Sequence, residues 1–174
     1  MKVLVLLIKP VLFSVIAMLL GTGFVIAAET DDAAVFVEAF NAYQKQDYLL
    51  AIEKAAQLNQ AFPESPLKDV SLLLIARSGI KSGDNELAAK TIVKFRAEFS
   101  DSALAGTIED ELLALGARHQ NGEQLQPNTR LQAVALKTRE DQQALERTAA
   151  LKLEQEKLAK EKAQRDFPWI RGGK

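Results

Sequence analysis

Several stretches of the chain carry apolar residues at spacings of one, three, four and seven, which is the pattern of a helix with one buried face. The first stretch spans residues 33–43. Its apolar positions are Val35, Phe36, Ala39, Phe40 and Tyr43. Gln46-Asp47 then breaks the pattern, and Asp47 is a good N-cap for a second helix that ends near Phe62. The pattern therefore predicts two helices joined by a short turn.

The sequence pattern of this pair of helices occurs twice, at an offset of 37 residues. The positions that match at this offset are Asp47 with Asp84, Ala51 with Ala88, Phe62 with Phe99, and Leu67 with Leu104. Residues 67–81 repeat the first helix, and Gly83-Asp84 repeats the turn. A fixed period with helical spacing inside each copy indicates a repeat array, and such arrays bind partners more often than they catalyse reactions.

Small residues and prolines mark the contacts and the ends of these helices. Four alanines are expected where the helices of a pair cross closely: Ala39, Ala51, Ala76 and Ala88. A larger side chain at such a crossing would overpack it at a cost of ~1–3 kcal/mol. Pro63 and Pro66 end the first pair. A third copy of the first helix is expected from Ser102 to about Arg118, without a second helix in register.

Taken together, these positions resemble the tetratricopeptide repeat. The residues that carry the resemblance are Ala39, Asp47, Tyr48, Ala51, Leu58 and Pro63 in the first copy and Ala76, Gly83, Ala88 and Phe95 in the second. The period exceeds the family's usual period of about 34. It places the three extra residues at the junction between Pro63 and Pro66.

This longer variant resembles the repeats of bacterial envelope proteins, such as the barrel-assembly lipoprotein of the outer membrane and the cell-division coordinator of the Tol-Pal system. The resemblance covers residues 33–118. The chain departs from the lipoprotein because it has no cysteine to carry a lipid and has fewer repeats. The resemblance implies an all-α, TPR-like array of helical hairpins that binds a protein partner.

The resemblance also implies a concave surface lined by the first helix of each pair. The residues expected at this groove are Phe36, Phe40, Tyr43, Leu73, Arg77, Lys81 and Arg118. Aromatic and basic side chains together suit an amphipathic or extended peptide. The pattern leaves an alternative open, in which the apolar members belong to the core and the cations are solvated.

Residues 1–28 form a separate apolar segment that starts with Lys2 and ends in small residues. This pattern predicts a secretory signal peptide cleaved after Ala27 or Ala28. The alternative is an uncleaved anchor, because the 19 residues that start at Pro10 approach the ~20 needed to span a membrane. The first interpretation predicts an exported, periplasmic protein, and the second an inner-membrane protein that faces the periplasm.

The repeat domain, residues 29–122, is followed by residues 123–166, which favour one long charged helix. Residues 29–128 carry nine basic and sixteen acidic residues, a net charge of −7, whereas residues 129–174 carry eleven and seven, a net charge of +4. Three arrangements of the long helix stay open. Its first part docks on the array and the rest frays, it pairs weakly with a second copy, or it projects into solvent. In the docked arrangement, Leu131 and Val134 would cap the last repeat. The pairing would use the seven-residue track of Ala144, Leu151 and Leu158.

The chain ends in an aromatic and basic tail, residues 167–174. Its apolar side chains are Phe167, Trp169 and Ile170. One interpretation is a short anchor for a partner or a membrane surface. The other is an ordinary terminus, or one that folds back on the domain.

The sequence offers no recognisable reaction chemistry. It has no cysteine, and its single histidine, His119, stands without the paired ligands that a metal site needs. No phosphate-binding or nucleophile motif is present, so we expect no enzyme activity and no cofactor. A net charge of −1 gives no reason to expect nucleic acid. We therefore predict a non-catalytic exported adaptor; the alternative is a membrane-anchored oligomeric scaffold that self-associates through the C-terminal helix.

Overall fold

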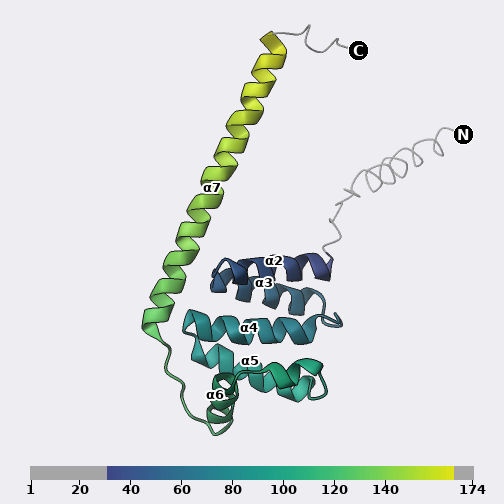
Figure 1. The fold of residues 1–174 in the computed structure, drawn as a ribbon, viewed down its shortest axis with the longest axis vertical. Helices are drawn as coiled ribbons and strands as arrows, with labels where there is room; N and C mark the ends of the chain where they lie inside the picture. Colours follow the sequence, from purple (N-terminus) through teal and green to yellow (C-terminus); the bar gives the residue numbers. More distant parts are fainter. Residues whose placement is uncertain (1–30, 167–174) are drawn as a thin grey trace, which may run out of the picture. The chain divides into compact units, whose positions relative to one another are not determined.

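The computed structural model describes residues 31–166, which form six α-helices and one short 3-10 helix and contain no strand. The elements are α2 (Asp32–Gln44), α3 (Tyr48–Ala61), α4 (Lys68–Ser82), α5 (Asn85–Glu98), η1 (Ala103–Thr107), α6 (Asp110–Gln120) and α7 (Thr129–Asp166). Figure 1 shows α2 to α5 stacked in chain order, with α7 as one long helix. The prediction of an all-α helical array followed by a long helix is confirmed. The expected signal segment (1–28) and tail (167–174) lie outside the described residues.

Each helix of the array packs on its neighbours in the chain, α2 on α3, α3 on α4, α4 on α5 and α5 on α6. The four alanines predicted at the crossings, Ala39, Ala51, Ala76 and Ala88, are fully buried. Gly79 of α4 also lies at such a crossing, because a Cβ added there would meet Ala88 at 3.1 Å. Small residues therefore set how closely the two helices of a hairpin approach.

The two hairpin turns have the same construction of hydrogen bonds. The Asp47 carboxylate accepts a hydrogen bond from the backbone N–H of Leu50 at 3.0 Å, and Asp84 accepts one from Leu87 at 2.9 Å. Each aspartate thus caps the helix that follows it. The residue before each cap has a left-handed backbone, with φ of 62° at Gln46 and 82° at Gly83. Turn and cap therefore recur at the predicted offset.

The junctions between hairpins recur at the same offset. The Ser65 hydroxyl donates to the Asp32 carboxylate at 2.6 Å, and the Ser102 hydroxyl donates to Asp69 at 2.7 Å. Each bond ties the segment that follows one hairpin to the first turn of that hairpin's first helix. The hydrogen bond from Ser65 holds the pKa of Asp32 below its usual range.

The predicted helix from Ser102 to Arg118 is wrong in its first part. Residues 103–107 form the 3-10 helix η1, the next two residues are extended, and α6 begins only at Asp110. Gly106 is a weak helix former. The Thr107 hydroxyl donates to the backbone carbonyl of Leu104 at 2.8 Å, a local bond that competes with helix formation. The third first-helix is therefore shorter than its counterparts.

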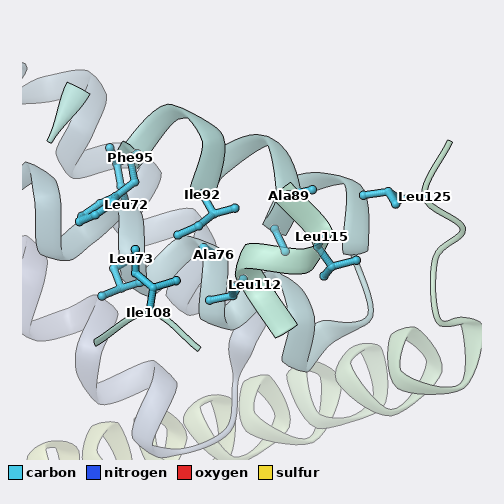
Figure 2. Packing of buried hydrophobic residues seen from close by; sticks show 11 residues of the cluster. Leu72, Leu73, Ala76, Ala89, Ile92, Phe95, Ile108, Leu112, Leu115 and Leu125 are labelled. Carbon is cyan, nitrogen blue, oxygen red and sulfur yellow. The ribbon is translucent and has the colours of Figure 1, made fainter. Parts of the chain in front are cut away.

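The core consists of two clusters. The larger one joins α4, α5 and α6 and contains Leu72, Leu73, Ala76, Ala88, Ala89, Ile92, Phe95, Ile108, Leu112, Leu115 and Leu125 (Figure 2). The smaller one joins α2, α3 and α4 and contains Ala39, Ala55, Leu74 and Ile75. Leu125, which lies in the connection after α6, reaches the larger cluster, so this connection is anchored to the array.

The connection then brings α7 to the side of the array. The backbone N–H of Asn128 donates to the carbonyl of Gly83 at 2.8 Å, and its side chain caps α7. The helix packs on α3 and α4. Ala135 is buried, whereas Leu131 is 36% and Val134 is 57% exposed. The idea that Leu131 and Val134 cap the last repeat is therefore wrong, because Leu125 and the Gly83 turn direct α7 across the hairpin turns instead.

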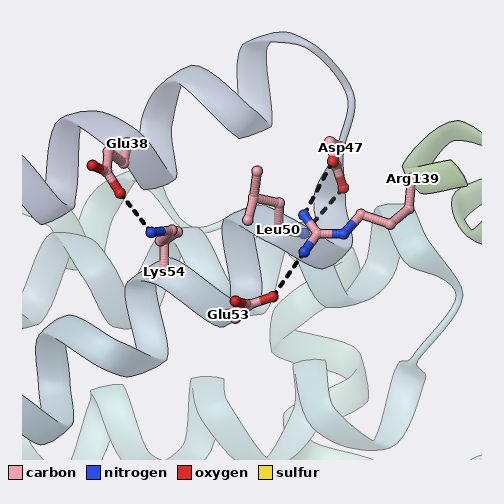
Figure 3. Close-up of polar contacts among 6 residues, drawn as sticks. All are labelled: Glu38, Asp47, Leu50, Glu53, Lys54 and Arg139. Carbon is pink, nitrogen blue, oxygen red and sulfur yellow. Dashed lines mark hydrogen bonds and ion pairs between the residues drawn. The ribbon is translucent and has the colours of Figure 1, made fainter. Parts of the chain in front are cut away.

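One guanidinium holds α7 to the first hairpin. Arg139 contacts Asp47 at 3.3 Å and Glu53 at 2.9 Å (Figure 3). Beyond this point, the side chains of residues 144–165 are exposed. The first half of α7 thus packs on the array, which confirms the predicted arrangement in which the first part of this helix docks there.

Candidate functional site

The first helices of the two hairpins, α2 and α4, border an open pocket of about 430 Å³. Its lining residues are Phe36, Phe40, Tyr43, Val70, Leu74, Arg77 and Glu109. Most of this lining is apolar, and its two charged residues, Arg77 and Glu109, form an ion pair with each other. A concave, largely apolar site with few polar groups is the usual form of a binding pocket.

The aromatic side of the pocket comes from α2. Phe36, Phe40 and Tyr43 follow one another at spacings of four and three, so they share one face of the helix. The Phe36 and Phe40 rings are stacked with centroids 6.3 Å apart. Tyr43 packs edge-on against Tyr48 at 5.5 Å. Neighbouring rings restrain each other in this way, yet Phe40 remains 44% exposed, so its face is available to a ligand.

The polar side of the pocket comes from α4 and from the start of α6. The Arg77 guanidinium donates to the Glu109 carboxylate at 2.8 Å and to the backbone carbonyl of Thr107 at 2.9 Å. Glu109 can reach it because Ile108 and Glu109 are extended ahead of α6. The charge of Arg77 is therefore matched within the chain, and the pocket presents a neutral ion pair instead of a free cation.

Four of the seven predicted groove residues come together in this pocket, namely Phe36, Phe40, Tyr43 and Arg77. The other three do not line it. Leu73 is 1% exposed and belongs to the larger core cluster. Lys81 is exposed near the end of α4. Arg118 forms an ion pair with Glu123 instead, and this pairing raises the pKa of Arg118 and lowers that of Glu123.

The sequence reasoning missed Val70, Leu74 and Glu109. A signal for the first two was present, because Val70, Leu74 and Arg77 follow the spacing of four and three that places residues on one helical face. Glu109 belongs to an acidic run that reads as solvated, and only the extended backbone before α6 turns it toward Arg77.

Two further pockets lie where α7 meets the array. One, of about 380 Å³, is lined mostly by apolar residues of α3, α5 and α7, including Leu49, Ile52, Leu87 and Leu136. The other, of about 390 Å³, is lined mostly by polar and charged residues and lies beside the Glu38–Lys54 and Asp47–Arg139 ion pairs (Figure 3). Both arise from the docking of the first half of α7.

Within residues 31–166, no three histidine, aspartate or glutamate side chains are placed to hold a metal ion. The imidazole of His119 pairs with Glu86, with 3.1 Å between Nδ1 and the carboxylate. No helix in this part of the chain is both long enough and apolar enough to cross a membrane. No family model matches the chain, and no curated protein and no solved structure matches it either.

Proposed function

We propose that this chain is a non-catalytic, TPR-like adaptor of the cell envelope that binds a segment of a protein partner between α2 and α4. The observation that carries the proposal is the pocket itself, in which an exposed Phe40 faces apolar side chains of α4. It lies between the first helices of successive hairpins, where the resemblance to tetratricopeptide repeats implies a binding groove.

The lining favours an apolar anchor residue on the partner. Because Glu109 already neutralises Arg77, an incoming carboxylate would have to displace an existing ion pair. An aromatic or aliphatic side chain instead gains by burial against Phe36, Phe40 and Leu74 at about 25 cal/mol per Å². We therefore expect partner segments that place one or two large apolar residues in the pocket.

Site-specific crosslinking tests this proposal. A photoreactive residue in place of Phe40 is compared with the same residue in place of Val134, which is exposed on α7 and does not line the pocket. We expect position 40 to capture defined peptides that mass spectrometry can identify, and position 134 to capture none of them. Identical products from both positions would contradict the proposal.

Affinity measurements on the captured peptide complete this test. The double variant Phe40→Ala, Arg77→Ala should lower affinity at least tenfold, about 1.4 kcal/mol. Circular dichroism shows whether the helices are intact, and Val134→Ala is the matched control. Retained affinity in the double variant would place the binding site elsewhere.

The envelope location rests on the apolar segment at residues 1–28. The mass of the protein recovered from cells tests it. Loss of ~27 residues indicates a cleaved signal and a periplasmic protein. An intact N-terminus in the membrane fraction indicates the anchored alternative.

A second candidate function is an oligomeric scaffold that self-associates through α7. The observation in its favour is the exposure of large apolar side chains beyond the docked half, at Leu145, Leu151, Leu153 and Leu158. The double substitution Leu151→Glu, Leu158→Glu interrupts the seven-residue track. It should abolish self-association if α7 pairs, and leave the sedimentation of the protein unchanged if it does not.

A further inference from the structure

The outer side of α2 carries an exposed, mostly apolar stripe. Ala33, Val37, Phe40 and Gln44 follow one another at spacings of four, three and four, which is the seam of two packed helices. All four side chains are exposed, Val37 by 54% and Phe40 by 44%. Only Phe40 of these four also lines the pocket between α2 and α4. The stripe is therefore a second surface beside that pocket.

The second hairpin shows what covers this surface when a neighbour is present. Val37 corresponds to Leu74 at the 37-residue offset. Leu74 is only 6% exposed, because it packs in the smaller core cluster with Ala39 of α2 and with Phe36 and Tyr43 beside it. A helix thus covers at α4 the position that is open at α2. The stripe on α2 continues the stacking interface of the array and fits a further helix.

The sequence of α2 identifies that helix, because it is self-complementary in the antiparallel direction. Three pairs of residues are symmetric about the midpoint between Glu38 and Ala39: Asp32 with Lys45, Ala33 with Gln44, and Val37 with Phe40. We propose that two copies of this chain pair through α2, with the two helices antiparallel. Each residue of the stripe then meets its symmetric counterpart on the second copy, as a two-fold contact requires.

Charge decides the orientation of the pair. α2 is acidic at its N-cap and first residue, Asp31 and Asp32, and the C-cap residue that follows it, Lys45, is basic. A parallel pair would place these like charges side by side, whereas an antiparallel pair places Lys45 beside the acidic start of the second helix. The helix dipoles also oppose each other in that arrangement. Glu38 adds no repulsion, because Lys54 of the same chain already pairs with it.

The contact is small, and this sets the expected strength. One pair of short helices buries less than the roughly 1,200 Å² of a standard stable interface. We therefore expect a reversible dimer with a dissociation constant in the micromolar range, about 1 μM or weaker. Partner binding and dimerisation share Phe40, but Val37 belongs to the dimer surface alone, so the two properties can be tested separately.

Sedimentation of the full chain tests the dimer. We expect the average mass to rise from monomer toward dimer over about a hundredfold range of concentration. Val37→Asp should weaken association at least tenfold, and Val134→Asp, at a similarly exposed residue of α7, should not. A monomer at every concentration would overturn the proposal, and so would association unchanged by Val37→Asp. Association lost in the Leu151→Glu, Leu158→Glu variant but kept in Val37→Asp would assign it to α7.

Thiol crosslinking tests the orientation, because the chain has no cysteine of its own. One copy carries Ala33→Cys and a second, distinguishable by mass, carries Gln44→Cys. In an antiparallel pair these two positions adjoin, whereas two copies of Ala33→Cys lie about 16 Å apart along the helix axis. A short bifunctional crosslinker should therefore join the mixed pair only. Products within one variant, or no product with both thiols reactive, would overturn the antiparallel dimer.

A thiol at position 37 distinguishes one further outcome. If another segment of the same chain covers the stripe, Val37→Cys should react slowly with a maleimide even in dilute, monomeric protein. Rapid reaction when dilute and protection when concentrated is the result expected of the dimer. Protection at all concentrations would overturn it.

Discussion

The first and second hairpins have the same backbone hydrogen bonds at their turns and caps, but they differ on one face of their first helices, α2 and α4. Both have an aspartate N-cap after a left-handed residue, and both are closed by a serine bonded to an aspartate of the first helix. The face of α4 that packs on the first hairpin is buried. Its residues are small or apolar: Ser71, Leu74, Ile75, Ser78 and Ser82. The equivalent residues 37 positions earlier, in α2 and at its C-cap, are exposed: Ala34, Val37, Glu38, Asn41 and Lys45.

This difference shows what each part of the repeat responds to. The residues that agree between the copies form the hydrogen bonds of the caps and turns, which are the same in both hairpins. The positions that differ follow their burial, because this face of α4 packs on the first hairpin and the equivalent face of α2 is exposed within the described residues. The outermost repeat of an array needs a polar outer side, and Glu38, Asn41 and Lys45 are polar on this face. Val37 is the one large apolar side chain among these exposed positions, and this is why we interpret the stripe on α2 as an interface.

The largest effect is expected where the two hairpins carry equivalent core residues, Leu58 and Phe95. Both are fully buried, but Phe95 lies in the larger cluster that joins α4, α5 and α6. We expect Phe95→Ala to lower the free energy of unfolding by about 3–5 kcal/mol, and Leu58→Ala by about 2–3 kcal/mol, because the terminal hairpin relaxes more easily. Chemical denaturation measures both values.

Hydrogen exchange separates the two hairpins further. Stability in repeat arrays is a sum of local terms and nearest-neighbour contacts. Leu58→Ala should therefore lose protection mainly in α2 and α3, and Phe95→Ala throughout the array. Equal loss of protection in both variants would mean that the array unfolds as one unit and that the two hairpins do not differ in this respect.

The next effect concerns the left-handed turn residues, Gln46 and Gly83. A Cβ at Gly83 would lie 2.4 Å from the carbonyl oxygen of Asn128, at the point where α7 starts. We expect Gly83→Ala to destabilise by about 2–4 kcal/mol, from left-handed strain and displacement of α7. Gln46→Gly should instead stabilise by about 0.5–1 kcal/mol, because it relieves the same strain. Thermal unfolding shows whether each substitution raises or lowers the stability. A Gly83→Ala variant that is as stable as the wild type, with α7 protected from hydrogen exchange, would contradict this account.

The repetition, and with it most of the array, could be predicted from the sequence. Aspartate at positions 47 and 84 caps the helix that follows, and alanine allows two helices to cross closely. Each of these roles depends on local sequence, so the residue type and its place in the pattern are enough to predict it. The start of α6 could not be predicted, because η1 depends on a hydroxyl that bonds locally at Thr107. The path of α7 could not be predicted either, since it depends on Leu125 entering a core formed by distant helices.

The candidate site was predicted only in part for a related reason. Helical spacing identifies the exposed aromatic face of α2, because the spacing is local. It does not say how far α4 is rotated relative to α2, and that rotation sends Leu73 into the core and Leu74 to the pocket wall. The pairing of Arg77 with Glu109 connects residues 32 positions apart. Such a contact follows from tertiary packing and has no local pattern.

A smaller effect is expected at the two N-caps. Replacing Asp47 or Asp84 by alanine should cost about 1 kcal/mol each, since each accepts one backbone hydrogen bond. Asp47→Ala should cost about 0.5–1 kcal/mol more, because it also removes a partner of Arg139. A double-mutant cycle between Asp47 and Arg139 measures that extra term, and high salt should change it little, because the Asp47 carboxylate is buried. A cycle energy near zero would show that the ion pair does not hold α7.

The smallest effect concerns the serine that closes the first hairpin. The Ser65 hydroxyl lowers the pKa of Asp32 by donating to its carboxylate. Ser65→Ala should therefore raise that pKa toward its ordinary value, which a carboxyl NMR titration measures. Ser102→Ala, the same change 37 residues later, is the control and should leave Asp32 unaffected.

The pH dependence has a defined sign. A carboxyl whose pKa is lower in the folded state stabilises the fold above its unfolded pKa, and this contribution disappears as the pH falls through the folded pKa. The stability difference between the wild type and Ser65→Ala should thus be largest near neutral pH and decrease in acid. A difference that stays constant in acid would mean that Ser65 acts through the hydrogen bond that its hydroxyl accepts from the backbone N–H of Leu67, and not through the charge of Asp32.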